Sequence, residues 1–120
     1  MKKMILYLLI LIFMGCAQSQ LSHTETAKIV VESFYMNDNS KLKKHTSPES
    51  YASFMSVQAI VAPGTDDASN FKLIKESVNG ETAWVKFSTS YEDNPETFKL
   101  VKIDGQWKVA EKGLSEKSPF

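Results

Sequence analysis

Apolar residues in the first half of the chain recur with the spacing of helices. Ser22-His23-Thr24-Glu25 has the form of a capping box, in which the serine hydroxyl and the glutamate carboxylate satisfy each other's exposed amides. Beyond it, apolar side chains recur at intervals of three and four, with Tyr35 beside them: Ala27, Val30, Val31 and Phe34. The pattern predicts a helix from Ser22 to the polar stop Asn37-Asp38-Asn39.

Two further helical segments are expected before the pattern changes. The first is a short turn that carries Leu42 and His45. The second begins at Ser47-Pro48-Glu49, which supplies a cap and then proline at the first helical position, where a missing amide costs nothing. Its apolar side is predicted to consist of Tyr51, Phe54, Met55 and the run from Val57 to Val61. The polar segment 62–67 ends it.

From Phe71 onward the apolar period changes to two, which is the period of strands. Four strands are predicted: Phe71 to Val78, Glu81 to Tyr91, Glu96 to Ile103 and Gln106 to Lys112. Asn79-Gly80 and Asp104-Gly105 favour two-residue type I′ turns, and Glu92 to Pro95 is interpreted as a longer connection. The fold class is therefore α+β, with N-terminal helices packed on a bent four-stranded antiparallel sheet.

The turns predict which side chains share a face. A two-residue turn at Asp104-Gly105 pairs Ile103 with Gln106 and Leu100 with Val109. The resulting core face comprises Phe98, Leu100, Trp107 and Val109. The same argument at Asn79-Gly80 places Glu76 with Ile74, Val78 and Ala83, and makes it the one acidic residue expected to face inward.

The opposite face of the sheet is expected to be mixed. It combines Phe71, Leu73 and Trp84 with Lys75, Lys86 and Ser88. Such a face suits a protein partner, including a homodimer formed through the sheet, although lysine stems can also cover the aromatic rings.

The N-terminus has the features of an export signal. Lys2 and Lys3 precede the apolar run Met4 to Met14, which at 11 residues is much shorter than the roughly 20 needed to span a bilayer. Gly15 and the single cysteine, Cys16, follow this run. We interpret residues 1–15 as a signal peptide and residues 16–23 as a tether. An ordinary secretory signal that leaves Cys16 without lipid is the alternative.

Composition limits the chemistry of the remaining 105 residues. Loss of Lys2 and Lys3 leaves 12 of the 14 lysines against 14 acidic residues, a net charge of −2, and the chain has no arginine. Nucleic acid is therefore not an expected partner. His23 and His45 lie in different segments, so no metal site is expected, and no cofactor or nucleophile motif is present.

Two resemblances give these features a context. The end of the apolar run, Phe13-Met14-Gly15-Cys16, resembles the lipobox of bacterial lipoproteins, with Phe13 in place of the usual leucine. This resemblance implies acylation of Cys16, which several acyl chains would hold firmly in a membrane. Ala17, rather than aspartate, follows Cys16, which by the same resemblance favours the outer membrane, facing the periplasm, in a Gram-negative host.

The domain itself resembles the nuclear-transport-factor-two-like superfamily, and within it small bacterial lipoproteins with a domain of unknown function. The segments that carry the resemblance are Ala27 to Tyr35, Asn79 to Phe87 and Leu100 to Val109. It covers residues 24–112, leaves residues 113–120 as a flexible tail, and implies a conical α+β roll with a pocket at its open end. Members include SnoaL-like cyclases, ketosteroid isomerase and scytalone dehydratase, as well as binding proteins without catalysis, and fold alone does not choose between them.

We therefore expect an envelope lipoprotein with a non-enzymatic module that binds a small apolar molecule or a protein. The alternatives are a small lyase or isomerase with Glu76 as its base, and a tethered inhibitor or immunity-type protein. Against catalysis, a bulge, a register slip or a lysine partner would leave Glu76 solvated. The candidate pocket residues are Tyr35, Tyr51, Phe54, Glu76, Tyr91 and Trp107.

Overall fold

The computed structural model describes residues 20–110 and 118–120. Three helices come first: α2 (His23–Met36), α3 (Asn39–Lys44) and α4 (Pro48–Val61). Four strands follow: β1 (Lys72–Asn79), β2 (Thr82–Thr89), β3 (Glu92–Ile103) and β4 (Gln106–Ala110). Several predicted features lie outside the described residues: the signal peptide, the lipidation site Cys16, the strand end at Lys112 and most of the tail.

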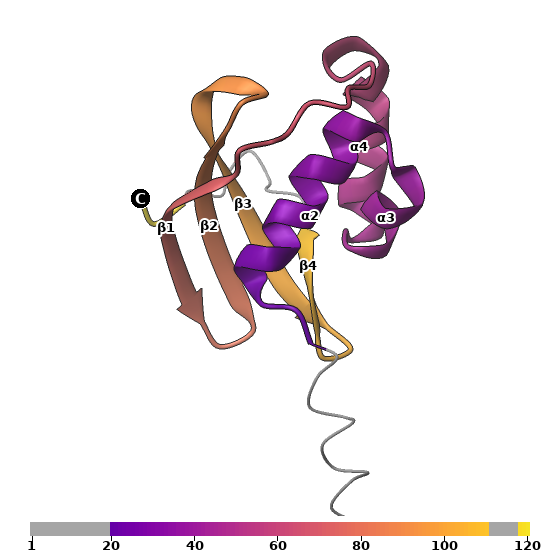
Figure 1. The fold of residues 1–120 in the computed structure, drawn as a ribbon. Coiled ribbons are helices and arrows are strands. Elements are labelled where there is room, and N and C mark those ends of the chain that lie inside the picture. The colour runs from indigo at the N-terminus through magenta and orange to yellow at the C-terminus, as the bar shows by residue number, and fades with distance from the viewer. Residues whose placement is uncertain (1–19, 111–117) are drawn as a thin grey trace, which may run out of the picture.

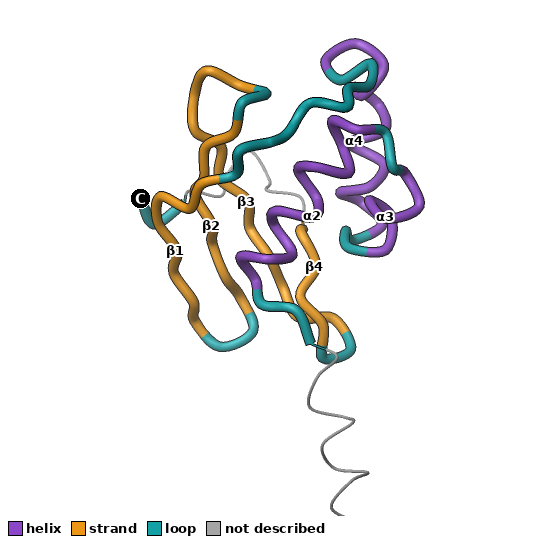
Figure 2. The backbone as a smooth tube through the Cα atoms, in the orientation of Figure 1, coloured by secondary structure: helices purple, strands orange, loops and turns teal. Residues whose placement is uncertain are grey.

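The strands form one open antiparallel sheet in the order β1-β2-β3-β4. The long helix α2 lies against one face of this sheet, and α3 and α4 pack beside it next to β4 (Figure 1; Figure 2). The predicted α+β class, with helices packed on a four-stranded antiparallel sheet, is confirmed. None of the helices within residues 20–110 is long and apolar enough to cross a bilayer.

Helix α2 begins and ends where its sequence predicts. The Ser22 hydroxyl accepts a hydrogen bond from the backbone amide of Glu25 and donates one to the Glu25 carboxylate, each at 3.1 Å. Asn37 ends the helix in the left-handed conformation, with φ of 60°. The predicted apolar stripe is buried: Ala27, Val30, Val31 and Phe34.

The start of α4 also agrees with the prediction, because the Ser47 side chain accepts from the Ser50 amide and Pro48 stands in the first turn. The prediction for its last turns is wrong. Val57, Ile60 and Val61 are 44%, 83% and 52% exposed. The buried residue there is Gln58, whose side-chain amide donates to the backbone oxygen of Phe34 at 3.0 Å. This bond turns Gln58, rather than its apolar neighbours, toward α2.

The β3–β4 hairpin has the predicted register. Asp104 and Gly105 both have positive φ, at 53° and 77°, as a type I′ turn requires. Ile103 pairs with Gln106 and Leu100 pairs with Val109. The free edge of β4 is then covered by the segment before α4, because the Ser47 amide donates to the Val109 oxygen at 2.9 Å and the Val109 amide donates to the His45 oxygen at 3.0 Å.

The β1–β2 turn differs from the prediction by one residue. Asn79 pairs with Thr82, so the turn consists of Gly80 and Glu81, with Gly80 at φ of 64°. Glu76 consequently pairs with Val85 rather than with Ala83. It remains on the face of the sheet that carries α2, as its phase predicted.

The predicted composition of the outer sheet face is wrong, because β1 has a bulge at Ile74. Leu73 pairs with Phe87, whereas Lys75 pairs with Lys86, so one residue of β1 is left over between them. The bulge turns the preceding residues inward, and Phe71 stacks on Phe87 with ring centroids 5.0 Å apart. Phe71 and Leu73 therefore do not share the outer face with Trp84 and Lys86.

The β2–β3 connection is tighter than predicted. Thr89 pairs with Glu92, so the turn is Ser90-Tyr91 and β3 already begins at Glu92. Residues 93–95 have no pairing partner on β2 and form an irregularity opposite Ser88. Proline has no backbone amide to donate, so Pro95 is well placed in this unpaired segment. The turn is held by the loop before β1, because the Ser90 amide donates to the Ser69 oxygen at 2.7 Å.

The core lies between α2 and the inner face of β2 and β3, where Val85, Phe87 and Leu100 have no exposed surface.

We expect Phe87→Ala to destabilise the domain by about 3–5 kcal/mol, because the Phe87 ring fills the space between Phe71 and Phe98. Urea unfolding measures this loss. Ile60→Ala is the control, and because Ile60 is 83% exposed its change should stay within about 0.5 kcal/mol. Equal losses in the two variants would contradict the core assignment.

Candidate functional site

An apolar hollow lies between α4, the middle of β3 and the end of β4. It has a volume of about 280 Å³. Its lining residues are Ser50, Ser53, Phe54, Val57, Thr97, Phe98, Lys99, Val109 and Ala110. Phe54 forms its aromatic wall with Phe98, and their rings meet edge to face at 5.9 Å. Exposed Val57 stands at its margin, so the hollow continues into the apolar surface of α4.

Ser50 gives this cavity an unusual polar feature. The residue is 2% exposed, and its Oγ has no hydrogen-bond partner in the described part of the chain. The capping contact uses the Ser50 backbone amide, which donates to the Ser47 hydroxyl at 3.2 Å, and leaves the side chain out. A buried hydroxyl without a partner is destabilising.

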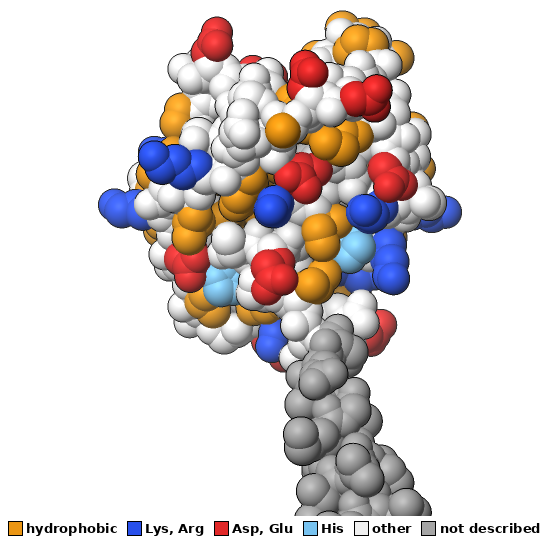
Figure 3. Space-filling view, viewed as in Figure 1, with side chains coloured by type: hydrophobic (Ala, Val, Ile, Leu, Met, Phe, Trp, Pro, Cys, Tyr) orange, Lys and Arg blue, Asp and Glu red, His pale blue; other side chains and the backbone are white. Residues whose placement is uncertain are grey.

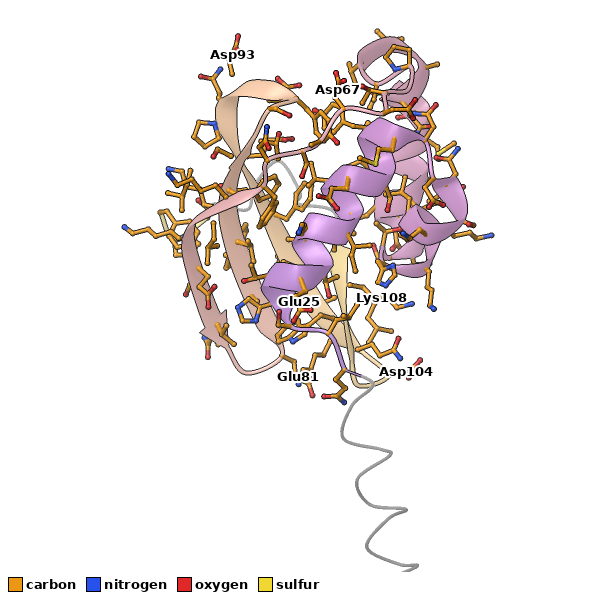
Figure 4. All side chains as sticks on the ribbon, in the orientation of Figure 1. Glu25, Asp67, Glu81, Asp93, Asp104 and Lys108 are labelled. Atoms are coloured by element: carbon orange, nitrogen blue, oxygen red, sulfur yellow. The ribbon has the colours of Figure 1, made fainter. Side chains whose placement is uncertain are left out.

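A second hollow, of about 270 Å³, lies at the loop end of the molecule. Tyr35 and Tyr91 stack there with ring centroids 4.5 Å apart. The Tyr35 hydroxyl donates to Glu92 at 2.9 Å, and the Tyr91 hydroxyl donates to the Asp67 backbone oxygen at the same distance. Figure 4 shows Asp67 and Asp93 at this end of the molecule, and Glu81 and Asp104 at the other.

Glu96 is a partly buried acid near Tyr35 of this pair. It pairs with Phe87 across the sheet and therefore faces inward. Its Oε2 is buried and has no hydrogen-bond partner among the described residues. Burial, and then the charge of Glu92, raise the pKa of Glu96 to about 7. The pKa of Tyr35 is also raised, by burial and by the nearby carboxylates Glu96 and Glu92, so Tyr35 stays a hydrogen-bond donor at neutral pH.

Glu76, the acid singled out from the sequence, lies in a different environment. Its carboxylate accepts a hydrogen bond from the Thr24 hydroxyl at 2.9 Å and lies 3.2 Å from His23 Nε2. Its side chain is 42% exposed. The hydrogen bond from Thr24 lowers the pKa of Glu76 more than its slight burial raises it. His23 comes from α2 rather than from the sheet, so the strand pattern gave no indication of this contact.

The six predicted pocket residues do not form one site. Tyr35 and Tyr91 meet in the second hollow, and Phe54 lines the first. Trp107 lines a third, of about 120 Å³, beside His45 and Gln20. Tyr51 and Glu76 line none of these three. Within residues 20–110 and 118–120, no group of three or more His, Cys, Asp or Glu side chains forms a metal site.

Sequence reasoning missed Glu96 and Ser50. The signal for Glu96 was available, because it stands two residues before Phe98 and shares its inward phase. Glu76 was therefore not the only inward acid. Ser50 carried no signal, since a serine in the first turn of a helix is ordinary. On the face shown in Figure 3, acidic and basic side chains are interspersed among apolar ones, and several basic side chains gather at the right beside a histidine.

The sequence matches no protein-family model, and no curated protein resembles it significantly. Among solved structures, it is similar to a protein from Campylobacter jejuni that is provisionally described as an NTF2-like transpeptidase. The two share 18% identity with a TM-score of 0.55, over 73% of this chain and 96% of that one. The fold is thus NTF2-like, and the fold is all that a similarity at this identity shows.

We expect Glu96→Gln to stabilise the domain increasingly as pH rises. Because the pKa of Glu96 is raised from 4.5 to about 7 in the folded state, the wild type loses stability as pH rises through this interval. Above about pH 7 the variant should be more stable by about 1–2 kcal/mol, after allowance for solvent screening. Near pH 4 the two should be equal.

Urea unfolding between pH 4 and 9 measures this difference. Glu49→Gln, at an exposed position of α4, is the matched control and should show no such trend. A Glu96→Gln advantage that is constant with pH would show that the carboxyl is not buried as described.

Proposed function

We propose that this chain is an envelope lipoprotein whose NTF2-like domain is a non-enzymatic module that binds a small apolar molecule. Lipid on Cys16 would hold it to a membrane, which in a Gram-negative host would be the outer membrane, facing the periplasm. The apolar cavity beside α4 carries the binding part of this proposal. The anchor rests on the short apolar run that ends at Gly15-Cys16.

The cavity supports a ligand because it combines apolar walls with few polar groups. Phe54, Val57 and Phe98 supply walls from both α4 and β3. Binding pockets for small molecules have this composition, and their volumes begin at roughly 300 Å³. A cavity of about 280 Å³ therefore fits a ligand smaller than most drugs.

The position of the cavity is compatible with a membrane anchor. Gln20 lies at the β3–β4 turn, where its side chain donates to the Gly105 oxygen at 3.3 Å. Cys16 is four residues earlier and reaches at most about 14 Å from it. Strand β4 leads from this turn to Ala110 at the cavity, about 16 Å away. The cavity would thus lie at the other end of β4 from the point where the chain leads to Cys16.

Acid–base catalysis is the second candidate, and Glu96 favours it rather than Glu76. A carboxyl with a pKa of about 7 can give and take a proton near neutral pH, and Tyr35 stands close enough to sense its charge. Glu76 is half-exposed and its pKa is lowered, so it suits a base poorly. Binding is preferred because Glu96 lines none of the three hollows described above.

The anchor predicts that Cys16→Ala abolishes lipidation and processing of the precursor. Cells grown with a clickable palmitate analogue should label the wild type and leave the variant unlabelled, with its signal peptide retained. Ser19→Ala, close by in the same segment, is the control and should label normally. Equal labelling of the Cys16→Ala variant would exclude this anchor.

The cavity predicts that an apolar photoreactive probe labels α4 and β3. We expect Val57→Gln to reduce this labelling about ten-fold in the lipidated protein held in nanodiscs, because Val57 lines the cavity. Ile60→Gln is the matched control on the same helix, and it should leave labelling unchanged because Ile60 does not line the cavity. Mass spectrometry of the labelled peptides is the measurement. Equal loss in both variants would indicate a general apolar surface instead of a site.

A further inference from the structure

The unpaired Ser50 hydroxyl indicates what kind of ligand the α4 cavity would take. Ser50 is almost fully buried, lines the cavity and has an Oγ without a partner in the described chain. Most buried side-chain polar atoms in proteins are hydrogen-bonded, so an exception calls for a partner from outside. A ligand oxygen or nitrogen in the cavity would supply it.

The surroundings favour a head group that accepts hydrogen bonds and carries negative charge. Ser50 is in the first turn of α4, where the helix dipole presents its positive end. No acidic residue is among those lining the cavity, and the ammonium group of Lys99 lies over the ring of Trp84, its partner across the strands, 5.8 Å from the ring centroid. An amine would meet the helix dipole unfavourably, whereas a carboxylate would be attracted by it.

The size of the cavity limits the rest of the ligand. At about 30 Å³ for each water-sized group, 280 Å³ accommodates roughly nine such groups. Phe54, Val57 and Phe98 offer this body only apolar contacts. A chain of about eight carbons meets both conditions.

We propose that the α4 cavity binds a medium-chain carboxylate, with its apolar chain against Phe54 and Phe98 and its head group accepting a hydrogen bond from Ser50. This assignment rests on the proposed binding function and names its ligand class. The Ser50 Oγ is closed off from water, so the head group reaches it when a neighbouring side chain shifts.

The experiment measures competition against the apolar photoreactive probe, in the full lipidated protein in nanodiscs, with empty nanodiscs as the baseline. The competitors are octanoate, octylamine and octane. Octanoate should displace the probe at about a ten-fold lower concentration than either of the others, as one hydrogen bond to a charged group allows. Ser50→Ala should remove this advantage and leave octane unchanged. Ser56→Ala, exposed on the same helix, should behave as the wild type.

Thermal unfolding without competitor adds a readout that a purely structural serine would not give. Removal of an unpaired buried hydroxyl should raise the Tm of the Ser50→Ala protein by about 4 °C or more, while octanoate binding falls. A Tm that falls would mean that the hydroxyl has a partner within the protein, and it would overturn the assignment.

The two levels of the proposal fail differently. If the probe labels the cavity but octanoate, octylamine and octane compete equally, the carboxylate is wrong and the apolar binding function stands. If octanoate competes best in both the wild type and Ser50→Ala, Ser50 is not the contact for the head group, and the assignment is wrong. If the probe does not label α4 or β3 at all, the binding function and the ligand class fail together.

Discussion

The contact between α2 and the inner face of β2 and β3 is the interaction on which the rest of the structure depends. Four apolar residues of α2 and the facing residues Val85, Phe87 and Leu100 are all at most 5% exposed. Each such side chain contributes about 1.5–3 kcal/mol by leaving water. One helix is too narrow to cover four strands. The segment before α4 therefore covers the edge of β4, and β1 keeps most of its surface exposed.

This uneven cover explains why two acids on the same face of the sheet behave in opposite ways. Glu76 stands on β1 against the first turn of α2, where its side chain is 42% exposed and the Thr24 hydroxyl stabilises its charge. Glu96 stands on β3 under aromatic side chains, where its charge is poorly solvated. From strand alternation alone, Glu76 and Glu96 would be expected to have similar surroundings, because both face inward. The difference comes from how deeply each carboxylate is buried and from the hydrogen bonds that it accepts.

The elements that depend on neighbouring residues could be predicted from the sequence, and those that depend on distant contacts could not. The Ser22 cap and the Asp104-Gly105 turn are local, and both stand where their residues indicate. The Ile74 bulge accompanies the stacking of Phe71 on Phe87, a distant contact that strand alternation does not reveal. The exposure of α4 follows in the same way from Gln58, which bonds to a residue 24 positions earlier.

The site was predictable to a smaller extent, because a pocket is made by the relative placement of elements. Phe54 was a candidate from its helical phase, and its partner Phe98 was assigned to the core face. Their meeting at the cavity depends on how α4 lies against β3.

The bulge in β1 also changes the exposed edge of the sheet. It interrupts the regular row of amides and carbonyls along the outermost strand, so a neighbouring molecule finds no continuous ladder to extend. At high local concentration, copies of the chain would thereby be kept from joining edge to edge into fibres.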